Sequence, residues 1–344
     1  MKRVVVAMSG GVDSSVAAFL LKQKGYDVIG LTMRLWADNS SAAADAKRVA
    51  KKLGIPHHVV DYRREFERDV IKYFCSEYKK GRTPNPCVVC NRKIKFGKLL
   101  ESAKALDADF LATGHYARIG RDEASGRYFI GEAADKSKDQ SYFLFDLDQR
   151  QLKSMLFPLG DIKKAEVKKI AKAAELKEVH DKPESQDICF IRGKGYREFI
   201  SGRVKGIRPG KVVDTCGKYM GMHKGIAFYT IGQREGLGIA AGKPIYVVKL
   251  DPRRNEVVVG DAGEVKGREL TANNVRWMSE AGLSKPVRAQ AKIRYNHPKS
   301  ACRVTPLSAG RLKAVFDEPQ HAITPGQALV VYDGEKVLGG GWIK

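Results

Sequence analysis

The 344-residue sequence has no long hydrophobic run, and no apolar stretch approaches the ~18 residues of a membrane-spanning helix. The apolar start of the chain, within MKRVVVAMSGG, stops after about six residues at a glycine loop, which is too short for a signal peptide. Low-complexity tracts and internal repeats are also missing. These absences argue against membrane and repeat proteins, and we expect a cytoplasmic protein without a membrane partner.

Acidic residues are few compared with basic ones. Asp and Glu number 39 against 62 Lys and Arg, which gives a formal net charge of +23 at pH 7. Basic side chains gain affinity for a polyanion because they release its counterions. They occur in both halves of the chain, as in RKIKFGKLL and AKIRYNHPK. The composition therefore favours nucleic acid as the partner, with a purely solubilising charge as the alternative.

Two common nucleotide motifs are missing as well. No Gly-Lys-Ser/Thr stands at the Walker spacing, and GLGIAAG, Gly236 to Gly242, has the wrong spacing for a dinucleotide fingerprint and is predicted to be a loop. What is present is KRVVVAM, a β-branched run typical of a buried parallel strand, followed at once by SGGVDSSVAAFLL. This order of strand, glycine loop and helix start binds phosphate, because backbone N–H groups and the helix dipole face the anion.

The loop SGGVDSS resembles the SGGxDS pyrophosphate loop of ATP pyrophosphatases, which adenylate a carbonyl oxygen and release pyrophosphate. Strands predicted in DVIGLTMRLW, HHVVDY and ADFLATGHYAR alternate with helices, the fourth strand ending at Gly114-His115. Such alternation predicts an α/β fold with a doubly wound parallel sheet and ligands at the carboxyl ends of its strands. The loop, Met33 and Gly114 lie at such ends and are predicted to surround one adenine nucleotide.

Beyond residue 195 the residue composition and the frequency of turns change. Glycines and β-branched residues separated by frequent turns predict antiparallel sheet, and the last segments alternate again in VRAQAKIRY, RLKAVFDEP and QALVVYDGEKVLGGGWI. We therefore expect three domains: a catalytic domain over 1–195, a small β-rich domain over 196–265, and a barrel, or failing that a sandwich, over 266–344.

A resemblance to a known family extends over nearly the whole chain. It rests on motifs in the order MSGGVDSSVAA, GRTPNPCVVCNRKIKF, ATGHYAR, KDQSYFL, FPLG, SQDICFI, TIGQREGLGI, IRY and TPGQALVVYDGEKVLGGG. On these motifs the chain resembles the tRNA-specific 2-thiouridylase family (MnmA/TrmU). The resemblance implies an adenine nucleotide alpha hydrolase-like catalytic domain, a role in tRNA binding for the domain over 196–265, and the thiolation of the wobble uridine of certain tRNAs.

The resemblance also implies roles for individual residues. Cys189 would carry the incoming sulfur as a persulfide, and Cys90 would be the catalytic cysteine that releases it by forming a disulfide with Cys189. The remaining implied positions fall into three groups. ATP would contact Ala7, Met8, Ser9, Gly10, Gly11, Val12, Asp13, Ser14, Met33 and Gly114; the target base would contact Asn85, Pro86 and Cys87; and tRNA would contact His115, Lys138, Asp139, Gln140, Arg294, Tyr295 and Gln327.

Cys87 is where the chain departs from the family, because many members carry aspartate there. The result is a C-x-x-C pair plus one distant cysteine, Cys189. Three interpretations stay open. They are a structural zinc site that lacks an identified fourth ligand, a [4Fe-4S] cluster held by Cys87, Cys90 and Cys189, and the persulfide route. Cys75, Cys216 and Cys302 receive no role.

Two other functions are consistent with parts of the sequence. One is a tRNA-binding or sulfur-carrier protein without catalysis, which the intact loop and cysteines disfavour; the other is a different carbonyl-adenylating synthetase or amidotransferase. For the thiolase we expect ATP with Mg²⁺ as cofactors. The expected partners are the anticodon stem-loop of wobble-uridine tRNAs and an upstream sulfur donor, such as a cysteine desulfurase.

Overall fold

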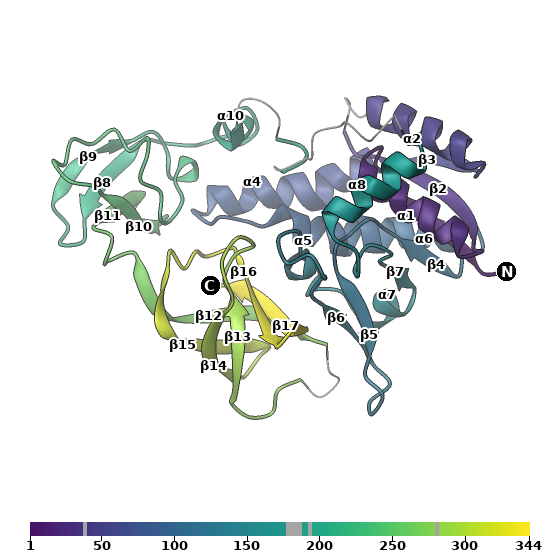
Figure 1. Ribbon diagram of the computed structural model, residues 1–344. Coiled ribbons are helices and arrows are strands. Elements are labelled where there is room, and N and C mark those ends of the chain that lie inside the picture. Colours follow the sequence, from purple (N-terminus) through teal and green to yellow (C-terminus); the bar gives the residue numbers. More distant parts are fainter. Residues whose placement is uncertain (37–39, 177–187, 192–194, 279–281) are drawn as a thin grey trace.

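Five parallel strands form the sheet of the first domain, in the order β3-β2-β1-β4-β7. The computed structural model describes residues 1–36, 40–176, 188–191, 195–278 and 282–344 (Figure 1). The strands are β1 (Arg3–Ala7), β2 (Asp27–Arg34), β3 (His57–Asp61), β4 (Phe110–Ala112) and β7 (Met155–Leu156). Every neighbouring pair is parallel, so the predicted α/β fold is confirmed.

Helices cover both faces of this sheet because β1 is apolar on both sides. Val4 and Val6 pack with the helices α1 (Val12–Gln23), α2 (Ser40–Leu53) and α8 (Lys164–Ala173). Val5 points to the other face, which is covered by α5 (Pro86–Cys90), the π-helical segment η2 (Asn91–Lys98) and α6 (Leu99–Lys104). Since successive residues of a strand alternate between faces, this split makes the sheet doubly wound.

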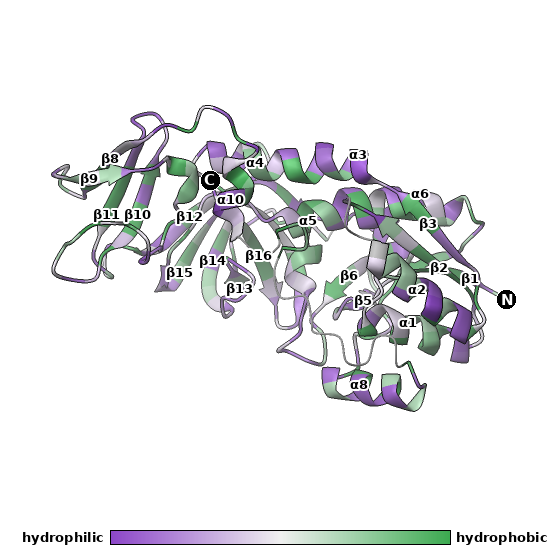
Figure 2. Ribbon diagram, turned by 90° about the horizontal axis from the view of Figure 1, so that it is seen from above, coloured by the Kyte–Doolittle hydropathy of each residue, from purple (hydrophilic) through white to green (hydrophobic). Residues whose placement is uncertain are grey.

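The other helices among the described residues are short, and each buries one face. Figure 2 shows hydrophilic and hydrophobic residues mixed along α8, which buries Val167 and Ala171 and exposes lysines. A longer helical stretch is built from α3, η1 and α4 in succession. These elements are α3 (Arg63–Phe66), the π-helical η1 (Glu67–Ile71), α4 (Lys72–Lys79), the 3₁₀ turns η3 (Ser141–Leu144) and η4 (Ile226–Phe228), α7 (Gln149–Lys153) and α10 (Gly195–Ser201).

The middle region forms a four-stranded sheet in the order β10-β11-β8-β9. Its strands are β8 (Gly210–Asp214), β9 (Tyr219–His223), β10 (Tyr246–Asp251) and β11 (Glu256–Gly260). The expectation of an antiparallel sheet was wrong for one pair, since β8 and β11 are parallel. The chain between them passes through β9, η4 and β10, which gives the long crossover that parallel neighbours need. Gly236 to Gly242 form a loop, as predicted.

The last region is a closed barrel of six strands in the order β12-β15-β14-β13-β16-β17, closed by pairing of β12 with β17. The strands are β12 (Lys266–Trp277), β13 (Val287–Lys292), β14 (Ser300–Leu307), β15 (Arg311–His321), β16 (Ala328–Asp333) and β17 (Lys336–Ile343). The first domain adds a hairpin to it. The strands β5 (Arg118–Arg121) and β6 (Tyr128–Gly131) extend the barrel sheet beyond β17, where Gly131 lies opposite Lys336 (Figure 1).

Two predicted strand ends were wrong. β4 ends at Ala112. The Thr113 N–H still donates to the Leu156 carbonyl, but the chain then turns and brings Gly114 against the start of α1. β13 stops at Lys292, so Arg294 and Tyr295 lie in the following turn and not on an alternating strand. Both motifs therefore lie in loops that follow strands, and loops carried on a rigid sheet often hold ligand contacts.

Candidate functional site

The loop between β1 and α1 has the shape expected of a phosphate cradle. Gly10 has a φ of +72°, and a side chain there would collide with the backbone oxygen of Ala42. Ser14 braces the loop: its Oγ donates to the Gly11 carbonyl at 3.0 Å and accepts from the Ser9 N–H at 3.1 Å. Gly11 caps α1 without a side-chain hydrogen bond, so the first N–H groups of a 12-residue helix stay directed at the loop.

Asp13 in this loop is held by a partner from far along the chain. The Lys164 Nζ lies 2.6 Å from one carboxylate oxygen and 2.8 Å from the other, and the Tyr116 hydroxyl donates to Asp13 at 2.7 Å. Lys164 begins α8 and its side chain is only 9% exposed, whereas that of Asp13 is 34% exposed. Sequence reasoning missed Lys164 because nothing distinguishes it from the other lysines of the KKAEVKK segment.

The predicted nucleotide residues gather at the carboxyl ends of the strands. Ala7 and Met8 end β1, Met33 lies at the end of β2, and Gly114 follows β4. Gly114 approaches the start of α1 so closely that a Cβ would lie 2.8 Å from the Asp13 carbonyl carbon and the Ser14 nitrogen. The sheet thus brings together the ATP residues that the family resemblance implied, although no bound nucleotide tests their roles.

His115, next to Gly114, is a buried neutral imidazole. Its Nδ1 lies 2.7 Å from the Thr113 Oγ1, and its ring packs against Phe96 and Phe157, which also contact each other. Burial, helped by the charge of Lys95, holds the pKa of His115 well below its ordinary value. The Lys95 Nζ lies 3.4 Å from the His115 Nε2. Lys95 in η2 is a second residue that sequence reasoning missed, because it is one of several basic residues in that run.

The two cysteines of the C-x-x-C pair lie one turn apart on α5. Asn85 caps this helix by accepting from the Val88 N–H, and Pro86 occupies its first turn. Cys90 is 7% exposed, and burial raises the pKa of its thiol to about 12, with smaller effects from Lys95, Cys189 and Cys87. Burial also raises the pKa of Cys87. Cys90 therefore bears a protonated thiol at neutral pH.

Cys189 is exposed, and the fold brings it into electrostatic range of Cys90 despite their separation in sequence. Its neighbour Phe190 anchors the segment, with ring centroids 5.6 Å from Phe66, 5.3 Å from Phe74 and 5.2 Å from Phe199. The first three residues of the SQDICFI motif lie outside the described residues. All six cysteines are described, and none is in a disulfide.

Cys87, Cys90 and Cys189 are not arranged as the ligands of a metal centre. Within the described ranges, no group of three His, Cys, Asp or Glu side chains is arranged to bind a metal ion. A shared metal centre needs the three sulfurs directed at one point, whereas Cys90 is buried on α5 and Cys189 is exposed. No step of the chemistry below is therefore routed through zinc or an iron-sulfur cluster.

The approach to α5 is held by the barrel. The Thr83 N–H donates to the Pro325 carbonyl at 2.9 Å, and the Gln327 Nε2 donates to the Thr83 carbonyl at 2.9 Å. Gly326 has a φ of +93°, and a Cβ there would lie 3.0 Å from the Thr83 oxygen. The turn Thr324 to Gln327 thus fits against the TPNPC segment, and Gln327 makes its contact to the protein backbone.

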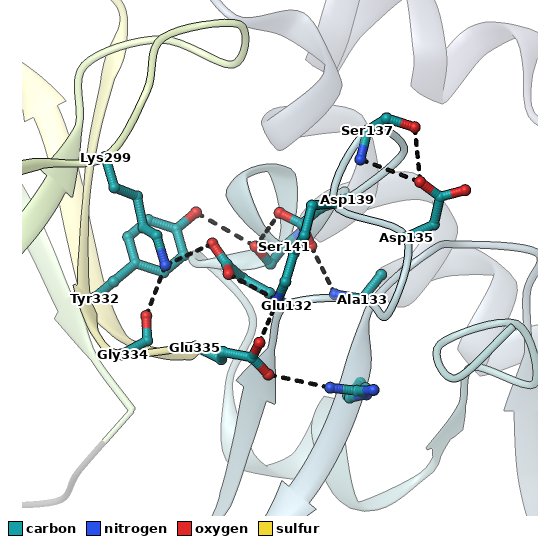
Figure 3. Close-up of polar contacts among 12 residues, drawn as sticks. Glu132, Ala133, Asp135, Ser137, Asp139, Ser141, Lys299, Tyr332, Gly334 and Glu335 are labelled. Atoms are coloured by element: carbon teal, nitrogen blue, oxygen red, sulfur yellow. Dashed lines mark hydrogen bonds and ion pairs between the residues drawn. The ribbon is translucent and has the colours of Figure 1, made fainter. Parts of the chain in front are cut away.

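The KDQ segment, Lys138 to Gln140, is also hydrogen-bonded to the rest of the first domain. Asp139 is 4% exposed and accepts hydrogen bonds from the Ala133 N–H and from both the N–H and the hydroxyl of Ser141 (Figure 3). Gln140 is bonded to Tyr116 through its backbone N–H at 2.7 Å and its side-chain oxygen at 3.0 Å. Lys138 is half-buried. Asp139 and Gln140 thus position the loop, and their direct contact with tRNA stays a prediction.

An aromatic pair lies beside the capped start of α5. The rings of Phe143 and Tyr295 are 4.4 Å apart between centroids, and both are half-buried. Tyr142 packs against both rings, and its hydroxyl donates to the Ala328 carbonyl at 2.9 Å. Arg294 is half-buried in the same turn as Tyr295. Phe143 was not predicted as a site residue, although it stands three residues beyond Gln140 in the KDQSYFL motif.

A doubly wound parallel sheet with a phosphate-type loop at its carboxyl edge and a thiol-bearing helix beside it defines an α/β nucleotide-binding protein. Family models match in three successive parts, named tRNA methyl transferase HUP domain over residues 2–193, tRNA methyl transferase PRC-barrel domain over 197–261, and aminomethyltransferase beta-barrel domain over 267–343. Named relatives, given next, match over the whole chain. The chain belongs to the tRNA-specific 2-thiouridylase family.

Three relatives illustrate the extent of the match. The tRNA-specific 2-thiouridylase MnmA of Clostridioides difficile is 47% identical, with 100% of this chain and 98% of the relative covered. The MnmA of Halothermothrix orenii is 48% identical at 100% and 99% coverage, and that of Moorella thermoacetica is 49% identical at 99% and 99%. The family assignment therefore includes all three parts of the molecule.

Solved structures resemble only part of the chain. The U34-tRNA thiolase NcsA from Methanococcus maripaludis with its [4Fe-4S] cluster is 22% identical with a TM-score of 0.36, covering 58% of this chain and 64% of that one. An NMN synthetase from Francisella tularensis is 16% identical with a TM-score of 0.31, covering 54% and 66%. No helix among the described residues is long and apolar enough to span a membrane.

Proposed function

We propose that the protein is an ATP-dependent tRNA-uridine 2-sulfurtransferase, which converts the wobble uridine of certain tRNAs to 2-thiouridine. The observation that supports this most is one connected set of contacts. The phosphate-type loop touches Gly114, His115 touches Lys95, and the charge of Lys95 reaches Cys87 and Cys90, which in turn interacts with Cys189. An activating nucleotide and a sulfur carrier therefore meet at one place.

The reaction needs both the phosphate-type loop and the cysteines. The C2 carbonyl of uridine is a poor electrophile, because its oxygen is a poor leaving group. When that oxygen attacks the α-phosphorus of ATP, pyrophosphate leaves and the oxygen becomes part of an adenylate. Sulfide then attacks C2, the C2–O bond breaks, and AMP leaves with the bonding electrons. The loop Ser9 to Ser14 holds the phosphates in this proposal, and Met33 and Gly114 border the nucleoside.

We propose the persulfide route for the sulfur. The sulfur of Cys90 loses its proton and attacks the Sγ of the Cys189 persulfide, so that a disulfide forms between the two cysteines. The outer sulfur leaves with the electron pair of the broken S–S bond and takes up that proton as hydrogen sulfide. A sulfur donor, such as a cysteine desulfurase, reloads Cys189 after an external thiol has reduced the disulfide. The exposure of Cys189 supports its access to a donor protein.

We propose that tRNA lies across the three domains. Family-model matches over 2–193, 197–261 and 267–343 support the proposed boundaries near 195 and 265. The target base enters at Asn85, Pro86 and Cys87, against the rings of Phe143 and Tyr295, because aromatic faces stack on unpaired bases. The excess of 62 basic over 39 acidic residues supports binding of the anticodon stem-loop. Mg²⁺ would enter with the ATP phosphates and neutralise part of their charge, and a cytoplasmic location stays a prediction from the sequence.

The test of the function is ATP–pyrophosphate exchange with and without tRNA. We expect exchange that depends on a wobble-uridine tRNA, together with 2-thiouridine formation when a persulfide donor is added. Cys189→Ala should keep exchange and lose thiolation. Exchange that is indifferent to tRNA would favour another carbonyl-adenylating synthetase, and tRNA binding without exchange would favour a binding protein.

The sulfur route has its own test. Anaerobically purified protein should be active and free of iron and acid-labile sulfide, and trapping of the reaction should yield a Cys90–Cys189 disulfide by mass spectrometry. About four iron atoms per active chain, lost together with activity on chelation, would replace the persulfide route by a cluster.

A further inference from the structure

Lys95 is a half-buried cation for which the described part of the chain supplies no carboxylate counter-ion. Among the described residues, no carboxylate lies within ion-pair distance of it. The neighbouring basic residues of the same run differ, since Arg92 pairs with Asp146, Lys93 with Asp69 and Lys98 with Glu101. A partly desolvated ammonium without a partner is costly, so this position indicates an anion that binds there.

The contact with His115 orients the Lys95 ammonium and determines which ring nitrogen of His115 carries the proton. An ammonium group has only donors, so Lys95 donates to the His115 Nε2 at 3.4 Å, and the Nδ1–H of the ring is left to donate to the Thr113 Oγ1 at 2.7 Å. The ring is therefore neutral and does not compete for an anion. It holds the Lys95 side chain at one orientation while two donors of the ammonium stay available.

The position of Lys95 lies between the two halves of the proposed reaction. On one side, His115 follows Gly114, which touches the backbone of Asp13 and Ser14 in the loop. On the other side, the π-helical η2 begins directly after Cys90, and five residues make about one turn of a π-helix, so Lys95 stands above Cys90 on nearly the same face. Its charge reaches the thiols of Cys87 and Cys90.

We propose that Lys95 is a catalytic residue that binds the phosphate of the uridine adenylate and of the departing AMP. This inference rests on the proposed function. In the adenylate the phosphate carries one negative charge, and breaking the C2–O bond gives AMP a second. A cation placed there interacts more strongly with the transition state than with the adenylate, which is the condition for accelerating the step.

The test compares a ligand that carries the phosphate with one that lacks it. Binding of AMP and of adenosine to the full chain is measured by titration calorimetry for the native protein and for Lys95→Met, Lys95→Arg and Lys93→Met. We expect Lys95→Met to weaken AMP binding about tenfold while adenosine binding changes less than about twofold. Lys95→Arg should recover most of the AMP affinity, and Lys93→Met, on the exposed side of the same helix, should change neither.

A kinetic measurement adds a second readout. Single-turnover thiolation by Lys95→Met should slow by about 10²–10³-fold, with tRNA affinity unchanged. Equal weakening of AMP and adenosine would make Lys95 a structural residue, and unchanged AMP affinity would also overturn the proposal. If Lys95→Met does not fold, Lys95→Gln replaces it with the same expectations. Because the binding comparison needs no tRNA, its result is independent of whether exchange depends on tRNA.

Discussion

At the scale of residues, one nearly buried charge of the site is Lys164, which joins the start of α8 to Asp13 in the loop. Replacing Lys164 by Met leaves the Asp13 carboxylate with the Tyr116 hydroxyl alone. We expect the free energy of unfolding to fall by about 1–3 kcal/mol, measured by urea denaturation, because a partly buried carboxylate loses its counter-ion. ATP–pyrophosphate exchange should fall with it.

A double-mutant cycle checks that the two residues act as a pair. The double variant Asp13→Asn with Lys164→Met should lose less stability than the sum of the two single variants, since each removes the same interaction. Additive losses would mean that Lys164 stabilises α8 by some other contact.

A buried thiol outside the site gives a prediction about pH. Cys302 lies in the barrel core, and burial raises the pKa of its thiol from an ordinary value of 9.0 to about 11. A pKa raised by folding contributes stability below about pH 9, and that contribution is lost as the pH rises towards about 11. The free energy of unfolding should therefore fall less steeply between pH 9 and 11 in Cys302→Ala than in the native protein. Cys216→Ala, at an exposed cysteine, should keep the native slope.

At the scale of elements, Gly114 closely approaches the start of α1. A methyl group at Gly114 would press on the backbone of Asp13 and Ser14 at 2.8 Å. Gly114→Ala should therefore displace the loop and lower exchange by about 10²-fold, because misplacement of a positioned group by about 1 Å has effects of this size. Gly202→Ala is the matched control, since its added methyl would meet nothing closer than 3.8 Å. Full activity of Gly114→Ala would show that the loop tolerates the shift.

The sequence predicted elements whose signal is local. The strand KRVVVAM and the loop SGGVDSS were located correctly, because β-branched runs, glycines and helix periodicity act within a few residues. The parallel pairing of β8 with β11 and the addition of β5 and β6 to the barrel were not predictable in this way, since they depend on packing between distant segments. Lys95 and Lys164 were missed for the same reason: only the fold distinguishes them from neighbouring lysines.

At the scale of the whole molecule, charged contacts join the first domain to the barrel. Glu132 is 5% exposed and pairs with Lys299 at 3.0 Å and Lys136 at 3.0 Å, while the more exposed Glu335 pairs with Arg118 and Lys136 (Figure 3). Glu132→Gln should destabilise the protein by about 1–3 kcal/mol, because the Lys299 side chain, 20% exposed, loses its counter-ion.

Glu335→Gln provides the comparison, with an expected loss of less than about 1 kcal/mol, since exposed ion pairs contribute little. Thermal unfolding of the two variants under the same buffer measures the difference. Equal losses would mean that burial does not decide the strength of this junction.

The hairpin of β5 and β6 has a consequence for how the chain is made. Its partner strand β17 lies about 200 residues further on, so on a ribosome adding ~5–20 residues per second the outer edge of β6 waits roughly ten to forty seconds for its neighbour. During that time an unpaired strand edge is open to pairing with another chain. Nascent chains that stall within the barrel should therefore aggregate through residues 118–131, and the catalytic domain becomes safe from self-association only when the last strand has emerged.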